Sequence, residues 1–95
     1  MESKELFRAL TGDADRLKDS VNKTITVKEV ETVETDKKIA VIKTADDKLL
    51  ISSSRNVVQI IPLLKNMVEL KPVELFVTAT EIGNGKSTIS VKLKE

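Results

Sequence analysis

The chain of 95 residues contains no cysteine, histidine, tryptophan or tyrosine. Without cysteine it forms no disulfide, so nothing indicates an oxidising compartment. Metal sites built on thiolate or imidazole are excluded, as is nucleophilic chemistry that depends on Cys or His. No apolar run approaches the roughly 20 residues that span a bilayer, and the first residues lack the basic start and apolar stretch of a signal peptide. We therefore expect a cytoplasmic protein that does not associate with a membrane.

An excess of charge of either sign is also lacking, because 16 Lys and Arg residues face 15 Asp and Glu residues. The net charge therefore gives no evidence for an acidic partner, and only local clustering of cations could indicate nucleic acid. The carboxylates are scattered, and their spacing does not hold two of them together in a shielded site, as general acid–base catalysis requires. We expect a non-catalytic protein with no cofactor, no metal and no small-molecule substrate.

One segment with helical periodicity lies inside a chain otherwise patterned for strands. Its apolar positions are Val57, Ile60, Ile61, Leu64, Met67 and Val68. Strand-like runs precede it at residues 24–35, 38–44 and 48–53, and two more follow at 71–80 and 87–94. The order β-β-β-α-β-β predicts a mainly β, five-stranded OB-like barrel whose helix plugs the barrel between the third and fourth strands. We expect one domain over residues 1–95, with an N-terminal helical segment at 1–20 and the barrel at 21–95.

Local signals refine this prediction. Pro62 lies off the face formed by Val57, Ile61 and Leu64, so it should kink the helix or begin a second short helix. The alternation of the first strand slips near residues 29–30, which predicts a bulge there. The second strand is apolar on both faces, so we expect a helix over residues 3–10, capped by Ser3, to cover its outer face.

Lysine and arginine fall on strands two and three, at the start of the helix and on the last hairpin. The candidate nucleic-acid-binding residues are Lys38, Lys43, Lys48, Arg55, Lys86 and Lys92. In OB folds, strands two and three and the loops joining strands 1–2 and 4–5 bind the ligand, so these cations suit a track of phosphates. The alternative is that they are ordinary exposed strand lysines, which also block aggregation at a sheet edge.

Aromatic residues are scarce, since Phe7 and Phe76 are the only two. Proteins that bind single strands usually stack bases on aromatic rings, each worth about 1–3 kcal/mol. We expect Phe76 to point away from the barrel interior, where it either stacks a base or packs against Phe7 or Leu10, and we favour the packing. The scarcity favours a second hypothesis, a small barrel that binds other proteins through a strand edge or the apolar outer face of strand two.

Three segments carry a resemblance to a known family. They are Val21-Asn-Lys-Thr-Ile-Thr-Val-Lys-Glu-Val, Thr44-Ala-Asp-Asp-Lys-Leu-Leu-Ile-Ser-Ser-Ser-Arg and Gly83-Asn-Gly-Lys. Residues 21–94 resemble the small OB-fold single-stranded DNA-binding proteins of phages and conjugative elements of Gram-positive bacteria. The resemblance implies single-stranded DNA as the partner, a role in the DNA replication of a phage or mobile element, and a site in the bacterial host cytoplasm. It leaves open whether the protein is a homo-oligomer.

Overall fold

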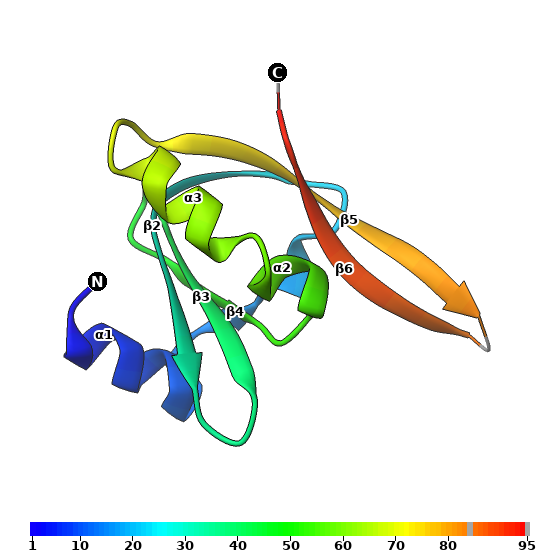
Figure 1. Ribbon diagram of the computed structural model, residues 1–95, viewed down its shortest axis with the longest axis horizontal. Coiled ribbons are helices and arrows are strands. Elements are labelled where there is room, and N and C mark those ends of the chain that lie inside the picture. The colour runs from blue at the N-terminus through cyan, green and yellow to red at the C-terminus, as the bar shows by residue number, and fades with distance from the viewer. Residues whose placement is uncertain (84, 95) are drawn as a thin grey trace.

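A single curled sheet with short helices forms this protein, in a computed structural model that describes residues 1–83 and 85–94 and only the backbone of Ile82 and Lys86. The strands are β1 (Asp15–Arg16), β2 (Thr24–Glu34), β3 (Lys38–Thr44), β4 (Leu49–Ser52), β5 (Val73–Gly83) and β6 (Lys86–Leu93). The helices are α1 (Ser3–Arg8), the π-helix η1 (Ala9–Asp13), the 3₁₀ helix η2 (Leu17–Ser20), α2 (Arg55–Val58) and α3 (Ile61–Val68). The strand order is β1-β4-β3-β2-β5-β6, and the sheet curls around α2 and α3 into a barrel-like, mainly β fold (Figure 1).

The described residues form six strands, so the prediction of five strands is wrong by one. The five predicted runs correspond to β2–β6, and β1 is the addition. It pairs in parallel with β4, with Asp15 opposite Leu50 and Arg16 opposite Ile51. Because β1 has only two residues, it shows no alternation that a sequence pattern could reveal. Within the described residues β4 pairs with β1 and β3 and not with β6, so the curl stays open on that side.

The core lies inside the curl and is capped by the two central helices. Val57, Ile61 and Leu64 are at most 4% exposed, which confirms the predicted buried face. Pro62 stands in the first turn of α3, directly after α2 has ended, so it begins a second short helix rather than bending one long helix. The predicted bulge in β2 is present a little earlier than expected, as a register shift between Val27 and Glu29.

The outer face of β3 is covered by the N-terminal helix, as predicted. Val41 is fully buried there, together with Ala9 and the partly buried Leu6. One detail differs from the prediction. The helix begins after Glu2, whose backbone N–H donates to the side chain of Glu5 at 3.4 Å, so Ser3 is not the cap.

The two phenylalanines do not pack together. Phe7 is 69% exposed on α1, and α1 with the following η1 lies far from β5, so the predicted contact of Phe76 with Phe7 or Leu10 is not formed (Figure 1). Phe76 is half-buried on the outer face of β5, between Thr24 of β2 and Lys92 of β6. Its neighbours are therefore strand residues and not the helix.

The last two strands form a hairpin that extends beyond the others (Figure 1). Asn84 lies outside the described residues, and its neighbours Gly83 and Gly85 adopt φ angles of 100° and 72°. These values suit glycine, because it lacks the Cβ that disfavours positive φ. Among the described residues, no helix is both long and apolar enough to cross a membrane.

Candidate nucleic-acid interface

A cleft of about 490 Å³ lies on the open side of the curl. Its lining contains three cations, five hydroxyl-bearing residues and three isoleucines: Arg16, Lys18, Lys37, Ser52, Ser53, Ser54, Ser87, Thr88, Ile39, Ile51 and Ile89. We refer to these residues as the open-side cleft. The cleft is in the size range of pockets that hold small ligands.

Segments far apart in the chain build the open-side cleft. Arg16 is held in β1 by its pairing with Ile51 of β4, and Lys18 follows in η2. Lys37 belongs to the β2–β3 turn, where its carbonyl oxygen accepts the backbone N–H of Thr35 at 3.1 Å. Figure 1 shows the β2–β3 and β5–β6 hairpins pointing in different directions, and the open-side cleft is lined from both.

Ser54 links the two sides of the open-side cleft. It occupies the N-cap position of α2, yet its side chain does not cap the helix. Its hydroxyl instead donates to the carbonyl oxygen of Ile89 at 2.6 Å and lies 3.1 Å from the hydroxyl of Thr88. A side chain therefore joins α2 to β6 at the side where β4 and β6 do not pair.

The electrostatic character of the open-side cleft is one-sided. Of the described residues that line it, all the charged ones are cations, namely Arg16, Lys18 and Lys37. A second hollow, of about 690 Å³, has mixed charge, because Asp15, Asp19 and Asp46 line it together with Lys23 and Lys48. Opposite charges neutralise each other in the second hollow, whereas the open-side cleft presents a local positive field.

Two of the predicted binding residues directly follow cleft residues in the sequence. Lys38 follows Lys37, and Arg55 follows Ser54; both side chains are exposed. Neither residue lines the cleft, and Lys38 directly precedes Ile39 on β3, so strand alternation points the Lys38 side chain to the opposite face from the cleft residue Ile39. The assignment of Lys38 and Arg55 to a binding surface stays a prediction.

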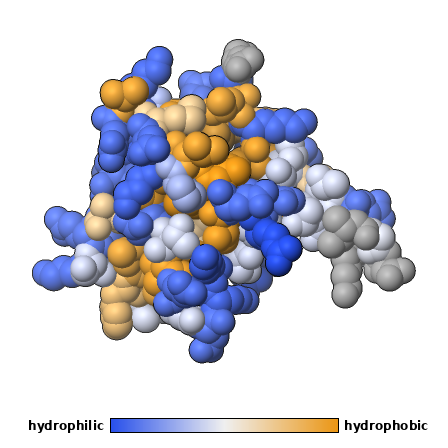
Figure 2. Space-filling view, in the orientation of Figure 1, coloured by the Kyte–Doolittle hydropathy of each residue, from blue (hydrophilic) through white to orange (hydrophobic). Residues whose placement is uncertain are grey.

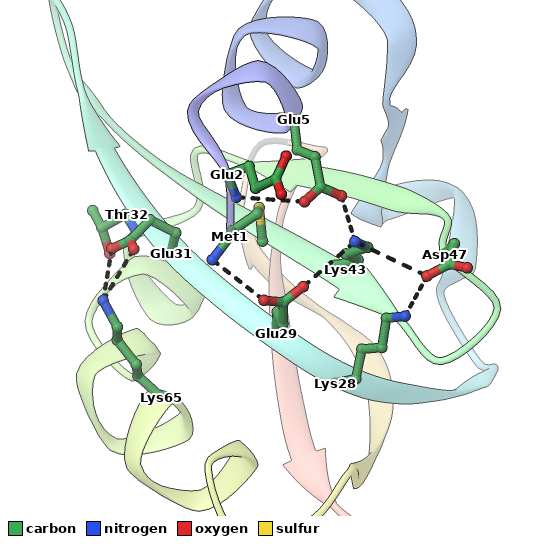
Figure 3. Close-up of polar contacts among 10 residues, drawn as sticks. All are labelled: Met1, Glu2, Glu5, Lys28, Glu29, Glu31, Thr32, Lys43, Asp47 and Lys65. Atoms are coloured by element: carbon green, nitrogen blue, oxygen red, sulfur yellow. Dashed lines mark hydrogen bonds and ion pairs between the residues drawn. The ribbon is translucent and has the colours of Figure 1, made fainter.

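Lys43 is occupied elsewhere. Its side chain is only 16% exposed, and its ammonium lies 2.5 Å from a carboxylate oxygen of Glu5 and 3.5 Å from one of Glu29 (Figure 3). The hydrogen bond with Lys43 lowers the pKa of Glu5, and the same bond raises the pKa of Lys43. Lys43 therefore fastens α1 to the sheet, and we omit it from the binding surface proposed below.

The remaining predicted residues are Lys48, Lys92 and Lys86, and neither of the first two lines the open-side cleft. Lys48 lies in the second hollow, 3.9 Å from Asp46. Lys92 is exposed on β6 opposite Phe76. Lys86 belongs to β6, but its side chain lies outside the described residues. The five candidates whose side chains are described are thus distributed over several surfaces.

Sequence reasoning missed Arg16 and Lys18 and did not select Lys37. The first two precede the first predicted strand, in a segment whose polar pattern shows no strand. The serine run at 52–54 directly precedes the helical segment, a position typical of a helix cap, so its pattern does not indicate a binding site. These groups come together because residues 15–16 pair in parallel with β4, and the sequence pattern does not predict that pairing.

No group of three or more acidic, cysteine or histidine side chains that could hold a metal ion occurs in the part of the chain that the structure describes. The chain matches no protein-family model, and comparisons with curated proteins and with solved structures give no significant match.

Proposed function

We propose that this protein is a non-catalytic single-stranded DNA-binding protein and that the open-side cleft is its binding site. The observation that carries the proposal is the separation of charge. In a chain with 16 basic and 15 acidic residues, the charged side chains that line this cleft are all basic. Lysine and arginine neutralise phosphates, and serine and threonine hydroxyls donate hydrogen bonds to them.

The fold supports the same proposal at the level of an OB-like barrel. Strands β2–β6 supply the five strands of such a barrel, and α2 and α3 stand between its third and fourth strands. The open-side cleft draws on β3, β4, the β2–β3 turn and the start of β6, which are the regions that bind oligonucleotides in OB folds. Together with the family resemblance, this favours a phage or mobile-element protein that acts in DNA replication in the cytoplasm of a bacterial host.

Within the proposed site, each kind of residue has a role. Arg16, Lys18 and Lys37 would neutralise successive phosphates. Because these contacts are to the backbone, binding would depend strongly on salt and little on sequence.

Titration of labelled oligo-dT by fluorescence anisotropy at several salt concentrations tests the proposal. Three phosphate contacts predict a slope of about −2 in a plot of log affinity against log salt, since each contributes about −0.7 on a single strand. Lys37→Ala should reduce the slope by about 0.7. Lys71→Ala removes the same charge from an exposed position outside the cleft and should leave the slope unchanged. Absence of binding at about 50 mM salt and micromolar protein would contradict the proposal.

Exposed apolar side chains favour a second candidate, a protein-interaction module. Leu63 is 66% exposed and Leu70 is 88% exposed, and Figure 2 shows apolar surface at the centre of the face where α2 and α3 lie. The outer face of β3 cannot serve this purpose, because Val41 is buried beneath α1. Oligo-dT binding that is unchanged by Leu63→Asp and abolished by the cleft variants would decide against this candidate.

A further inference from the structure

The open-side cleft contains an apolar floor that phosphate contacts leave unexplained. Ile39, Ile51 and Ile89 come from β3, β4 and β6, and all three are only partly buried. Phosphate groups gain little from contact with branched alkyl groups, whereas a nucleobase has a flat apolar face. Burying such surface gives about 25 cal/mol per Å².

We propose that these three isoleucines form a base subsite, in which one nucleobase of the bound strand packs against aliphatic side chains in place of an aromatic ring. The proposal rests on single-stranded DNA binding at the open-side cleft. It also offers a physical answer to the scarcity of aromatic residues. The chain has no Trp or Tyr, and neither Phe7 nor Phe76 lines the cleft.

The hydroxyl groups around the floor make the subsite tolerant of sequence. Ser53 and Ser87 are exposed in the cleft lining, and a serine hydroxyl both donates and accepts hydrogen bonds. Such a group can pair with the edge of any base. Ser54 is different, because its hydroxyl is already bonded to the carbonyl oxygen of Ile89 and holds that part of the floor in place.

Ile39 is the best position for a test. It lines the cleft but belongs to neither buried apolar cluster, so a substitution there has little packing to disturb. Ile51 and Ile89 pack against those clusters, and their variants would combine loss of binding with loss of stability.

The experiment compares labelled oligo-dT with an abasic deoxyribose-phosphate oligomer of the same length, so that phosphates are matched and bases are not. We expect the unaltered protein to prefer oligo-dT by about tenfold, the equivalent of 1.4 kcal/mol of apolar contact. Ile39→Ala should remove most of that preference with the salt slope unchanged. Leu63→Ala, at an exposed position outside the cleft, should keep both affinities.

Ile39→Trp provides a gain-of-function arm and a reporter. The chain has no other tryptophan, so its fluorescence would report on the subsite alone. We expect tighter binding and quenching with oligo-dT, and no quenching with the abasic oligomer, because only a base stacks on the ring. A melting curve for each variant establishes that it is folded.

The outcomes separate the two proposals. Equal affinity for oligo-dT and the abasic oligomer, with the salt dependence retained, would overturn the base subsite and leave the proposed function standing. Binding of neither oligomer would overturn both. Thymidine monophosphate should bind at least a hundredfold more weakly than oligo-dT; equal affinity would show that the subsite serves free nucleotides and would overturn its assignment to a strand.

Discussion

The hydroxyl of Ser54 lies 2.6 Å from the carbonyl oxygen of Ile89 and joins the start of α2 to β6. This bond spans the side of the sheet where β4 pairs with β1 and not with β6 within the described residues. A serine that begins a helix would ordinarily bond the backbone N–H groups of the first turn. Here the hydroxyl makes a tertiary contact instead, and this contact holds α2 against β6 across the open-side cleft.

Ser54→Ala should therefore lower the free energy of unfolding by about 1 kcal/mol, the usual net worth of one hydrogen bond. Urea denaturation measures the effect. Ser53→Ala is the matched control for stability, because Ser53 is the exposed neighbour in the same loop. Equal stability of the two variants would show that the bond to Ile89 does not hold β6.

Lys43→Met should loosen α1 from the sheet without altering oligo-dT binding by the folded protein, because Lys43 is paired with Glu5 and Glu29 rather than free for phosphate. The measurements are the melting temperature and an oligo-dT titration. Lys38→Met alters an exposed lysine on the same strand and should have the smaller effect on melting. A Lys43→Met protein of unchanged stability and weakened binding would restore Lys43 to the binding surface.

The same ion pair predicts a pH dependence. The folded protein lowers the pKa of Glu5 through the hydrogen bond from Lys43, so the resulting stability is present above the ordinary glutamate pKa of about 4.3 and is lost as pH falls through the lower folded pKa. The raised pKa of Lys43 acts at the other extreme, where stability is present below about pH 10.4 and is lost as pH rises through the folded pKa. Melting curves from neutral to acidic pH should fall less steeply for Lys43→Met. Parallel curves for the two proteins would exclude this pair as a source of acid sensitivity.

Ile61→Asp should unfold the protein or cost several kcal/mol, because Ile61 is 2% exposed in the core beneath the curled sheet and an aspartate there would be buried without a partner. Leu63→Asp introduces the same charge two residues later at a position that is 66% exposed, so it should change stability by less than about 0.5 kcal/mol. Circular dichroism with thermal melting compares the two. Similar melting temperatures would mean that the helix presents a different face to the sheet.

Phe76→Ala should cost only about 1 kcal/mol of stability, less than for a fully buried ring, because Phe76 is half-buried and lies outside both apolar clusters. It should leave oligo-dT binding unchanged, since Phe76 does not line the open-side cleft. Urea denaturation and anisotropy measure the two effects. A stable variant with binding reduced by the equivalent of about 1–3 kcal/mol would identify Phe76 as a stacking residue and move the binding site to the outer face of β5.

Local sequence pattern determined most of the fold. Strand-like apolar runs located β2–β6, period 3.6 located the buried face of α2 and α3, and Pro62 marked the boundary between the two helices. These features depend on contacts between near neighbours and on which side of an element meets the core. A pattern read along the chain contains that information.

The candidate site was decided by tertiary structure alone. The open-side cleft combines residues 16, 18, 37, 39, 51–54 and 87–89, which the strand order brings together. Its formation depends on β1, whose two residues are too few to show a period. Lys43 is a second example. Its position on a strand indicates an exposed cation, and only the docking of α1 gives it the carboxylate of Glu5 as a partner. Whether a side chain is exposed or paired with an opposite charge depends on segments that are distant in the sequence. The sequence therefore determines both only through the packing of its helices and strands.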